Sequence, residues 1–238
     1  RAYSAEFGDP IEAMAHISVK NHKNAMRNPL AQMPREVALE FCLSPSDKNP
    51  MIADPLKLSD CSLISDGAAA VVIAADDMAG QFKRAVGFRG TAQVNDLLPL
   101  SAKNLPYFEG PRRAIQQAYA EAGVSVDDLS LAEVHDCFTI AELLSVEALG
   151  MAAPGGGRAV VVNGETQRGG RLPINLSGGL KAKGHPVGAT GVSMHVLVAR
   201  QLLGEAGDMQ LPGADLGICV NMGGGAVSTY ASILEAVK

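Results

Sequence analysis

The chain has 238 residues, of which 47% are hydrophobic and 19% are charged, and its formal net charge is −5. This composition excludes an intrinsically disordered chain and allows a sizeable core. The sequence has no long run of like charge and no apolar stretch of membrane-spanning length. We therefore expect no nucleic-acid partner, no membrane partner and a cytoplasmic location.

The N-terminal part of the chain is predicted to be helical. Residues 3–27 have apolar side chains at helical spacing, and Asp9-Pro10 can mark a second helix start within them. Residues 34–54 are rich in Pro, Ser and Asn, which predicts a loop. The apolar run 68–75 that follows predicts a buried strand.

The rest of the chain alternates between helix and strand, which predicts a layered α/β domain. Helices are predicted over 110–123 (closed by Gly123), 139–149 and 192–203, strands over 129–134, 159–162, 216–221 and 226–234, and a glycine-rich loop over 169–191. Small residues precede a predicted strand at both 67–72 and 223–228, as a duplicated fold would leave them.

Two features concern the chain as a whole. The cysteines are scattered without a CxxC pair, which predicts free thiols; they are Cys42, Cys61, Cys137 and Cys219. The chain begins at Arg1, in a segment typical of helix in the middle of a protein. We therefore expect it to be a fragment of a longer protein.

The glycine-rich stretch 175–191 contains the first candidate functional residue, His185. Pro186 biases His185 toward extended geometry and so restricts the direction of its imidazole, while Thr190 can cap the helix that follows. Such a histidine can contact an oxyanion or activate a nucleophile. The alternative is a surface loop with an incidental histidine.

The second candidate stretch is Val134-His-Asp-Cys-Phe138, at the end of a predicted strand. His135 and Cys137 would project from the same face, and a nearby histidine can lower the pKa of a thiol toward neutrality. One alternative is a cysteine packed at a strand end. Another is a zinc site of His135, Cys137 and His185, which no CxxC or HxxxH pair supports, so we expect no metal.

The third stretch is Cys219-Val-Asn-Met-Gly-Gly-Gly225, where a predicted strand ends in three glycines. Exposed backbone N–H groups there could form an oxyanion hole. A tight turn without function is the alternative.

Together, and in this order, the three stretches resemble the thiolase superfamily. The Gly-His-Pro-x-Gly-Ala-Thr-Gly run at 184–191 is highly specific to that superfamily. His-Asp-Cys-Phe at 135–138 resembles the sterol-carrier-protein-2-type branch, where other thiolases have Asn-Glu-Ala-Phe. The resemblance implies the thiolase fold, a layered αβαβα arrangement of two similar halves with mixed sheets. Residues 1–53 would then be the remainder of the loop domain, 54–98 the end of the N-terminal half, and 99–238 the complete C-terminal half.

The resemblance also implies a two-step acyl transfer. A cysteine in the N-terminal half, which this chain lacks, would attack an acyl-CoA, and the acyl-enzyme would react with a second thioester or with CoA. His185 would activate that nucleophile and, with His135, hold the thioester oxygen of the second substrate. Gly223 would supply its backbone N–H to the other oxyanion hole.

Two positions depart from the common thiolase pattern. Most thiolases end in Cys-x-Gly with the cysteine as acid/base, whereas here Asn221 takes that place, and an amide cannot carry a proton. The resemblance to the sterol-carrier branch assigns this role to Cys137. Cys219 lies about 7 Å back along the strand from Asn221, which favours a packed core thiol. Cys61 lies where the family has the end of its N-terminal half, so we do not expect it to be the nucleophile.

Three functions therefore stay open: an acyl-CoA acyltransferase, a steroid side-chain aldolase of the same fold that forms no acyl-enzyme, and a non-catalytic subunit that binds CoA or a partner. The intact His135 and Cys137 favour the first. Coenzyme A or acyl-CoA is expected as substrate, with no permanently bound cofactor. The resemblance implies a homodimer or tetramer and, as in some relatives, a small OB-fold partner protein.

Overall fold

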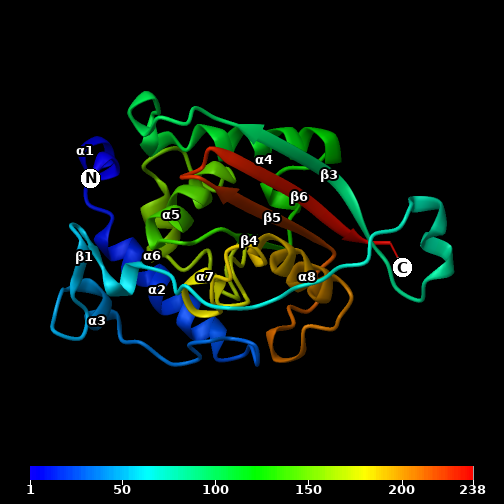
Figure 1. The fold of residues 1–238 in the computed structure, drawn as a ribbon, viewed down its shortest axis with the longest axis horizontal. Helices are drawn as coiled ribbons and strands as arrows, with labels where there is room; N and C mark the ends of the chain where they lie inside the picture. Colours follow the sequence, from blue (N-terminus) through cyan, green and yellow to red (C-terminus); the bar gives the residue numbers. More distant parts are fainter. Residues whose placement is uncertain (238) are drawn as a thin grey trace.

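A four-stranded mixed sheet forms the centre of the computed structural model, which describes residues 1–237 (Figure 1). The strand order is β3–β6–β5–β4; β4 runs parallel to β5, while β6 is antiparallel to both of its neighbours. The strands are β3 (Val86–Asn95), β4 (Leu131–Val134), β5 (Leu216–Gly223) and β6 (Ser228–Ala236). A separate small hairpin consists of β1 (Met51–Ala53) and β2 (Leu56–Lys57).

Eight α-helices accompany the sheet within residues 1–237. They are α1 (Ala2–Phe7), α2 (Ile11–Ala25), α3 (Leu39–Leu43), α4 (Glu109–Ala122), α5 (Thr139–Ala148), α6 (Gly157–Val162), α7 (Gly179–Ala182) and α8 (Thr190–Leu202). Pro10 precedes α2, so the predicted helix break at Asp9-Pro10 is confirmed. Gly123 ends α4 at φ 67°, in the left-handed conformation that glycine adopts without a steric penalty.

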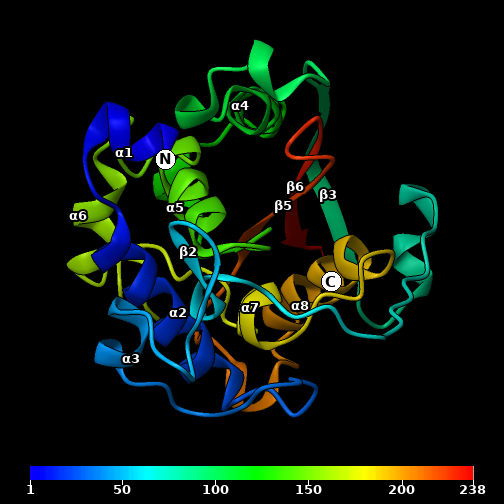
Figure 2. The same cartoon turned by 60° about the vertical axis from the view of Figure 1, so that its left-hand side comes forward.

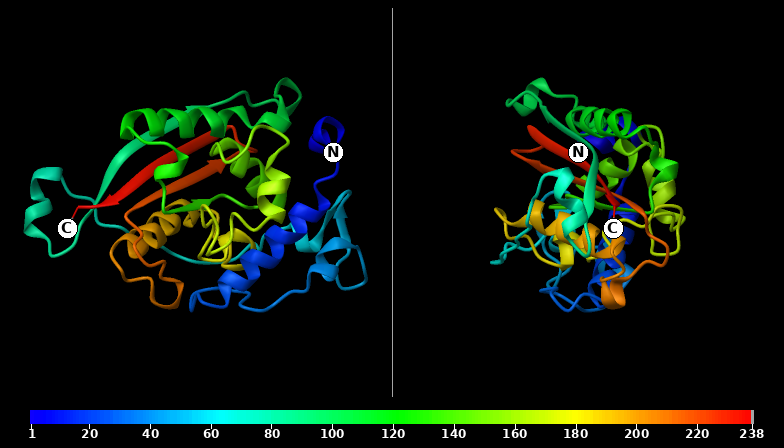
Figure 3. Two further views of the ribbon diagram at one scale, coloured as in Figure 1. Left: turned by 180° about the vertical axis from the view of Figure 1, so that it is seen from behind. Right: turned by 90° about the vertical axis from the view of Figure 1, so that its right-hand side faces the viewer.

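Helices cover both faces of the sheet, as Figures 2 and 3 show, with α4 and α5 on one face and α8 on the other. Alternate residues of β5 make the two interfaces: Ile218 and Val220 belong to the core under α4 and α5, and Cys219 belongs to the core under α8. A Cβ at Gly217 would lie 2.5 Å from Val198 Cγ1 on α8. Glycine at this position therefore permits the close approach of α8 to the sheet.

Two predicted strands are wrong. Residues 68–75 form no regular structure and are largely exposed, with Val72 at 92% (Figure 1). A strand needs a hydrogen-bonding neighbour, and none of residues 1–237 pairs with this segment. Residues 159–162 belong to helix α6 although Val160-Val161-Val162 favours a strand. The Gly157 N–H that begins α6 donates to the buried Glu147 carboxylate at 3.0 Å, so tertiary contacts override the local preference.

Strand β3 lies before residue 99, the boundary expected between the two halves, yet it pairs with β6 from Val86 to Asn95 in the same sheet as β4 and β5. Helix α2, from the segment expected to be loop domain, packs against α5, α6 and α7 beside that sheet. The expected domain boundaries stay a prediction.

Candidate active site

The pairing of β4 with β5 places His135 beside Asn221. The His135 N–H donates to the Val220 carbonyl at 3.0 Å and so extends the parallel ladder by one residue beyond β4. His135 Nδ1 lies 2.8 Å from Asn221 Oδ1. An amide oxygen only accepts hydrogen bonds, so in this arrangement Nδ1 carries the proton.

His185 is held by two hydroxyl groups. Its backbone N–H donates to Ser65 Oγ at 2.9 Å, and its Nδ1 lies 2.7 Å from Thr190 Oγ1. The Thr190 hydroxyl donates its own proton to the Pro186 carbonyl at 3.0 Å, so it accepts from His185 Nδ1–H. The expectation that Thr190 caps α8 is wrong, because its side chain makes no cap hydrogen bond and instead orients the imidazole.

The two histidine rings meet edge to face, with centroids 5.0 Å apart and an interplanar angle of 89°. Burial, then the charges of His135 and Lys183, lower the pKa of His185 from 6.5 to about 4. Burial also lowers the pKa of His135, against the opposing hydrogen bond of Asn221. Both rings are therefore neutral at pH 7, and neither Nε2 has a hydrogen-bond partner among residues 1–237. A neutral ring with Nδ1–H committed offers Nε2 as a base.

Cys137 lies two residues after His135 in the sequence, but its thiol is not shifted toward the thiolate form. Burial and the Asp136 charge raise the pKa of Cys137 to about 11. The expectation that a nearby histidine would lower this pKa toward neutrality is wrong, since burial and a carboxylate dominate. Cys137 therefore holds its proton at pH 7 and is suited to donate it.

The other two candidate thiols differ in position. Cys61 lies beside the Cys137 segment, because Ser62 N–H donates to the Cys137 carbonyl at 2.9 Å and Cys61 pairs with Phe138. Burial raises the pKa of Cys61, which disfavours a thiolate. Cys219 is 1% exposed and packs in the core beneath α8.

Gly223 is the last residue of β5, two positions after Asn221, and it is exposed. It pairs with Ser228, and its carbonyl accepts from the Val227 N–H at 3.0 Å. The structure thus places Gly223 at the end of the strand that also carries Asn221. Its contribution to an oxyanion hole stays a prediction.

A cavity of about 210 Å³ lies beside the His185 loop. Its walls include the extended segment 65–70, Lys183, Pro186 and one face of α8. The Lys183 ammonium donates to Ser193 Oγ at 3.0 Å. The lining carries two cationic side chains, Lys183 and Arg200, and one carboxylate, Asp66, so the cavity could hold a small polar or anionic group.

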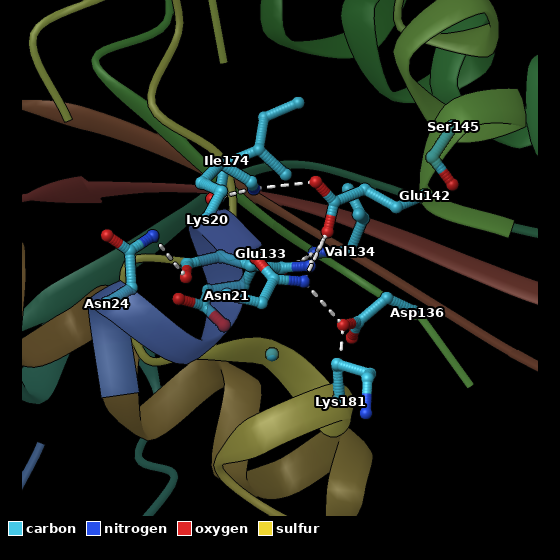
Figure 4. Close-up of polar contacts among 12 residues, drawn as sticks. Lys20, Asn21, Asn24, Glu133, Val134, Asp136, Glu142, Ser145, Ile174 and Lys181 are labelled. Carbon is cyan, nitrogen blue, oxygen red and sulfur yellow. Dashed lines mark hydrogen bonds and ion pairs between the residues drawn. The ribbon is translucent and has the colours of Figure 1, made fainter. Parts of the chain in front are cut away.

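A buried polar cluster, next to His135 along the chain through Asp136, was not predicted from the sequence (Figure 4). Asp136, Glu142 and Asn175 meet there with Lys20 and Asn21 of α2. All five side chains are at most 6% exposed. Asp136 and Asn175 belong to the candidate stretches 134–138 and 175–191, whereas Lys20, Asn21 and Glu142 belong to none of the candidate stretches.

Within the described range 1–237, no cluster of three or more His, Cys, Asp or Glu side chains could hold a metal ion. No helix in that range is long and apolar enough to cross a membrane.

Comparison with known proteins identifies the family. The family model described as "Thiolase C-terminal domain-like" matches residues 92–236. The chain belongs to the thiolase family. The acetyl-CoA acetyltransferase of Methanothermobacter thermautotrophicus is 41% identical over 226 residues, which are 94% of this chain and 58% of that protein. Sterol carrier protein 2 of Oryctolagus cuniculus is 36% identical over 235 residues, which are 95% of this chain and 42% of that protein.

The fold of this chain also matches solved structures. An "Ltp2-ChsH2(DUF35) aldolase" superposes with a TM-score of 0.84 over 98% of this chain and 60% of that chain, at 24% identity. The predicted resemblance to thiolases and the predicted thiolase fold are therefore confirmed. The chain spans about half the length of the curated relatives that it matches.

Proposed function

We propose that the whole protein is an acyl-CoA acyltransferase that makes or cleaves 3-ketoacyl-CoA, and that these 238 residues supply the acid/base part of its site. The pair of neutral histidines, each with Nδ1–H committed and Nε2 free, carries this proposal. The 41% identity to an acetyl-CoA acetyltransferase supports the reaction class.

In the cleavage direction, His185 Nε2 takes the proton of a nucleophilic cysteine that lies outside these residues. The thiolate attacks the ketone carbonyl of the 3-ketoacyl-CoA, and the C–C bond breaks to leave an acyl-enzyme and a carbanion. Cys137 gives its proton to the carbanion, for which its raised pKa is suitable because the thiol is fully protonated at pH 7. CoA then returns a proton to Cys137, attacks the acyl-enzyme and takes the acyl group, while the released thiolate recovers its proton from His185.

Oxyanions form on the carbonyl oxygens during both steps, and N–H donors stabilise them. Once His185 has taken a proton, its Nε2–H can act as such a donor. His135 can donate from Nε2 only when its Nδ1 is unprotonated, which requires the Asn221 amide to turn and present its NH₂ group. Gly223 N–H is the proposed donor to the oxyanion of the acyl-enzyme. No permanently bound cofactor enters these steps.

The proposed assembly is a homodimer or tetramer that takes acyl-CoA and can include a small OB-fold partner. The name of the aldolase with a similar fold, Ltp2-ChsH2(DUF35), includes a DUF35 component, which supports a partner protein. A steroid side-chain aldolase and a non-catalytic CoA-binding subunit are the competing functions.

One experiment separates the three. The full-length protein is mixed with acetoacetyl-CoA and CoA, acetyl-CoA formation is followed, and the quenched protein is examined by mass spectrometry for an acetylated cysteine. Turnover with an acyl-enzyme supports the proposal. In a parallel reaction with a 3-hydroxyacyl-CoA, cleavage without an acyl-enzyme indicates the aldolase. CoA binding without turnover in either reaction indicates the non-catalytic subunit.

The isolated 238-residue chain is expected to show no turnover above a heat-killed control; activity there would make Cys61 the nucleophile.

A further inference from the structure

Asp136 lies between His135 and Cys137 in sequence, and its side chain lies fully buried beside Asn21 and Lys181 (Figure 4). One carboxylate oxygen accepts the Leu180 N–H at 2.6 Å, and the other accepts the Lys181 N–H at 3.2 Å. These two N–H groups belong to α7, four and five residues before His185. The side chain therefore joins the end of β4 to the loop that carries the second histidine.

The contact between α7 and Asp136 is too close for any side chain to intervene. A Cβ on Gly179 would lie 2.3 Å from Asp136 Oδ2, and Gly179 has a φ of +60°. Only glycine combines that backbone conformation with that approach. The position of α7 is thus set directly against the carboxylate.

The opposite side of Asp136 is fixed as firmly. Asn21 Nδ2 donates to Asp136 Oδ2 at 2.8 Å and to Glu142 Oε2 at 2.7 Å. The Lys20 ammonium pairs with Glu142 Oε1 at 2.6 Å and donates to the Ile174 carbonyl at 2.6 Å. Helix α2 therefore holds the carboxylate from behind through Asn21, and Asp136 cannot move without breaking buried hydrogen bonds.

We propose that Asp136 is a positioning residue: its carboxylate ties α7 to the end of β4 and thereby fixes the spacing of His135 and His185. It touches no substrate in this role. The catalytic consequence rests on the proposed acyltransferase function, whereas the spacing of the rings does not.

The matched pair of substitutions is Asp136→Asn and Glu142→Gln in the full-length protein. Each replaces one buried carboxyl group of the same cluster with an amide, but of the two only Asp136 accepts hydrogen bonds from α7. An amide has one acceptor oxygen, so Asp136→Asn turns an NH₂ group toward N–H donors and loosens α7. We expect kcat to fall about tenfold to a hundredfold with KM changed less than about threefold, because a small misplacement of catalytic groups has an effect of this size. Glu142→Gln should retain kcat within about threefold.

A second pair changes no charge. Gly179→Ala pushes α7 away from Asp136, whereas Gly207→Ala introduces the same kind of backbone strain, at φ +58°, where nothing lies within 4 Å. We expect Gly179→Ala to reproduce the loss of kcat and Gly207→Ala to leave kcat unchanged.

If Glu142→Gln does not fold, Glu147→Gln replaces it, because Glu147 is a buried carboxylate on the same helix that accepts from Tyr3 and Gly157.

A measurement that needs no turnover is the NMR titration of the His185 ring. The resonance of this ring is assigned by its disappearance in the His185→Gln variant. The pKa of His185 should rise from about 4 toward 6.5 in Asp136→Asn and Gly179→Ala, because the ring leaves His135 and becomes hydrated. Burial and the Glu142 charge raise the pKa of Asp136 to about 7, so Asp136 is already neutral in the pH range where His185 titrates. A rise of the His185 pKa therefore reports movement of the ring and not the loss of a charge. An unchanged pKa in both variants, or an equal loss of kcat in Glu142→Gln, overturns the proposal. If the wild-type full-length protein shows no acyl transfer but the pKa of His185 still rises in both variants, the positioning role stands and the proposed function is rejected.

Discussion

Thr190 determines which nitrogen of His185 carries the proton. Its hydroxyl donates to the Pro186 carbonyl and accepts from His185 Nδ1–H at 2.7 Å, so Nε2 is left as the free base. Because Thr190 begins α8, the tautomer of the ring is set by the start of a helix five residues further along the chain. Reactivity at His185 therefore depends on a second side chain, that of Thr190.

Substitution of His185 by alanine should mainly lower the catalytic rate of the full-length protein. The variant loses the base and the later oxyanion donor, a change that costs about a hundredfold or more in kcat. Thr190→Val should cost about tenfold, because the ring keeps its place but loses its preferred tautomer. Val187→Ala, at an exposed position of the same loop, is the control. Near-normal turnover of His185→Ala in steady-state assays would make His185 an ordinary loop residue.

Substitution of Cys137 and of Cys219 by alanine should have opposite effects on turnover. Cys137→Ala should reduce Claisen condensation and cleavage strongly while some acyl-enzyme still forms, because the proton donor is lost after the first step. Cys219→Ala should retain activity and lose about 1–2 kcal/mol of stability, since a small buried side chain is shortened in the core. Turnover and acyl-enzyme formation are measured for both variants side by side. An inactive Cys219→Ala with an active Cys137→Ala would reverse the assignment.

His22 should make the protein less stable in mild acid. Burial and the Lys181 charge lower its pKa from 6.5 to about 4. Between these two values the unfolded chain binds a proton that the folded protein does not, so stability is complete above about pH 6.5 and is lost as the pH falls toward 4. His22→Gln should remove part of this loss, on the order of 2 kcal/mol after allowance for solvent screening. Urea unfolding at pH 7.5 and pH 5.0 tests it, and equal losses in both proteins would contradict the prediction.

The buried pair of Lys20 and Glu142 should be strongly coupled. Lys20→Met leaves the Glu142 charge without its cation in a fully buried place, which costs about 3–5 kcal/mol. Adding Glu142→Gln to Lys20→Met should recover a large part of that loss. A double-mutant cycle from urea unfolding measures the coupling, and additive effects would show that the ion pair is solvated in solution.

Much of the local structure and of the histidine site could be predicted from the sequence, because the signals are local. Strands β4 and β5 are apolar and bounded by turn residues, and Pro186 and Gly123 restrict their own backbones. The prediction of a strand at 68–75 was wrong because an apolar run does not reveal whether a neighbouring strand exists. The prediction at 159–162 was wrong because the contact of Gly157 with Glu147 is tertiary.

The supporting cluster could not be predicted for a different reason. Lys20 and Asn21 are polar residues in a helix, and such residues usually face solvent. Their burial depends on Glu142 and Asp136, which are more than 110 positions away in the chain. The low pKa of His185 and the raised pKa of Cys137 are also products of this packing, since burial is the largest cause of each.

The parallel pairing of β4 with β5 has a consequence for how the protein acquires its site during folding. Residues 131–134 bond to residues 217–220, and the intervening segment contains α5 to α8. Closing so long a loop costs entropy before any contact compensates for it, and folds dominated by such non-local pairing form slowly. His135 and Asn221 meet only when this pairing is complete. A refolding chain should thus form its helices well before His135 meets Asn221, and recovery of the complete site should follow recovery of helical circular dichroism.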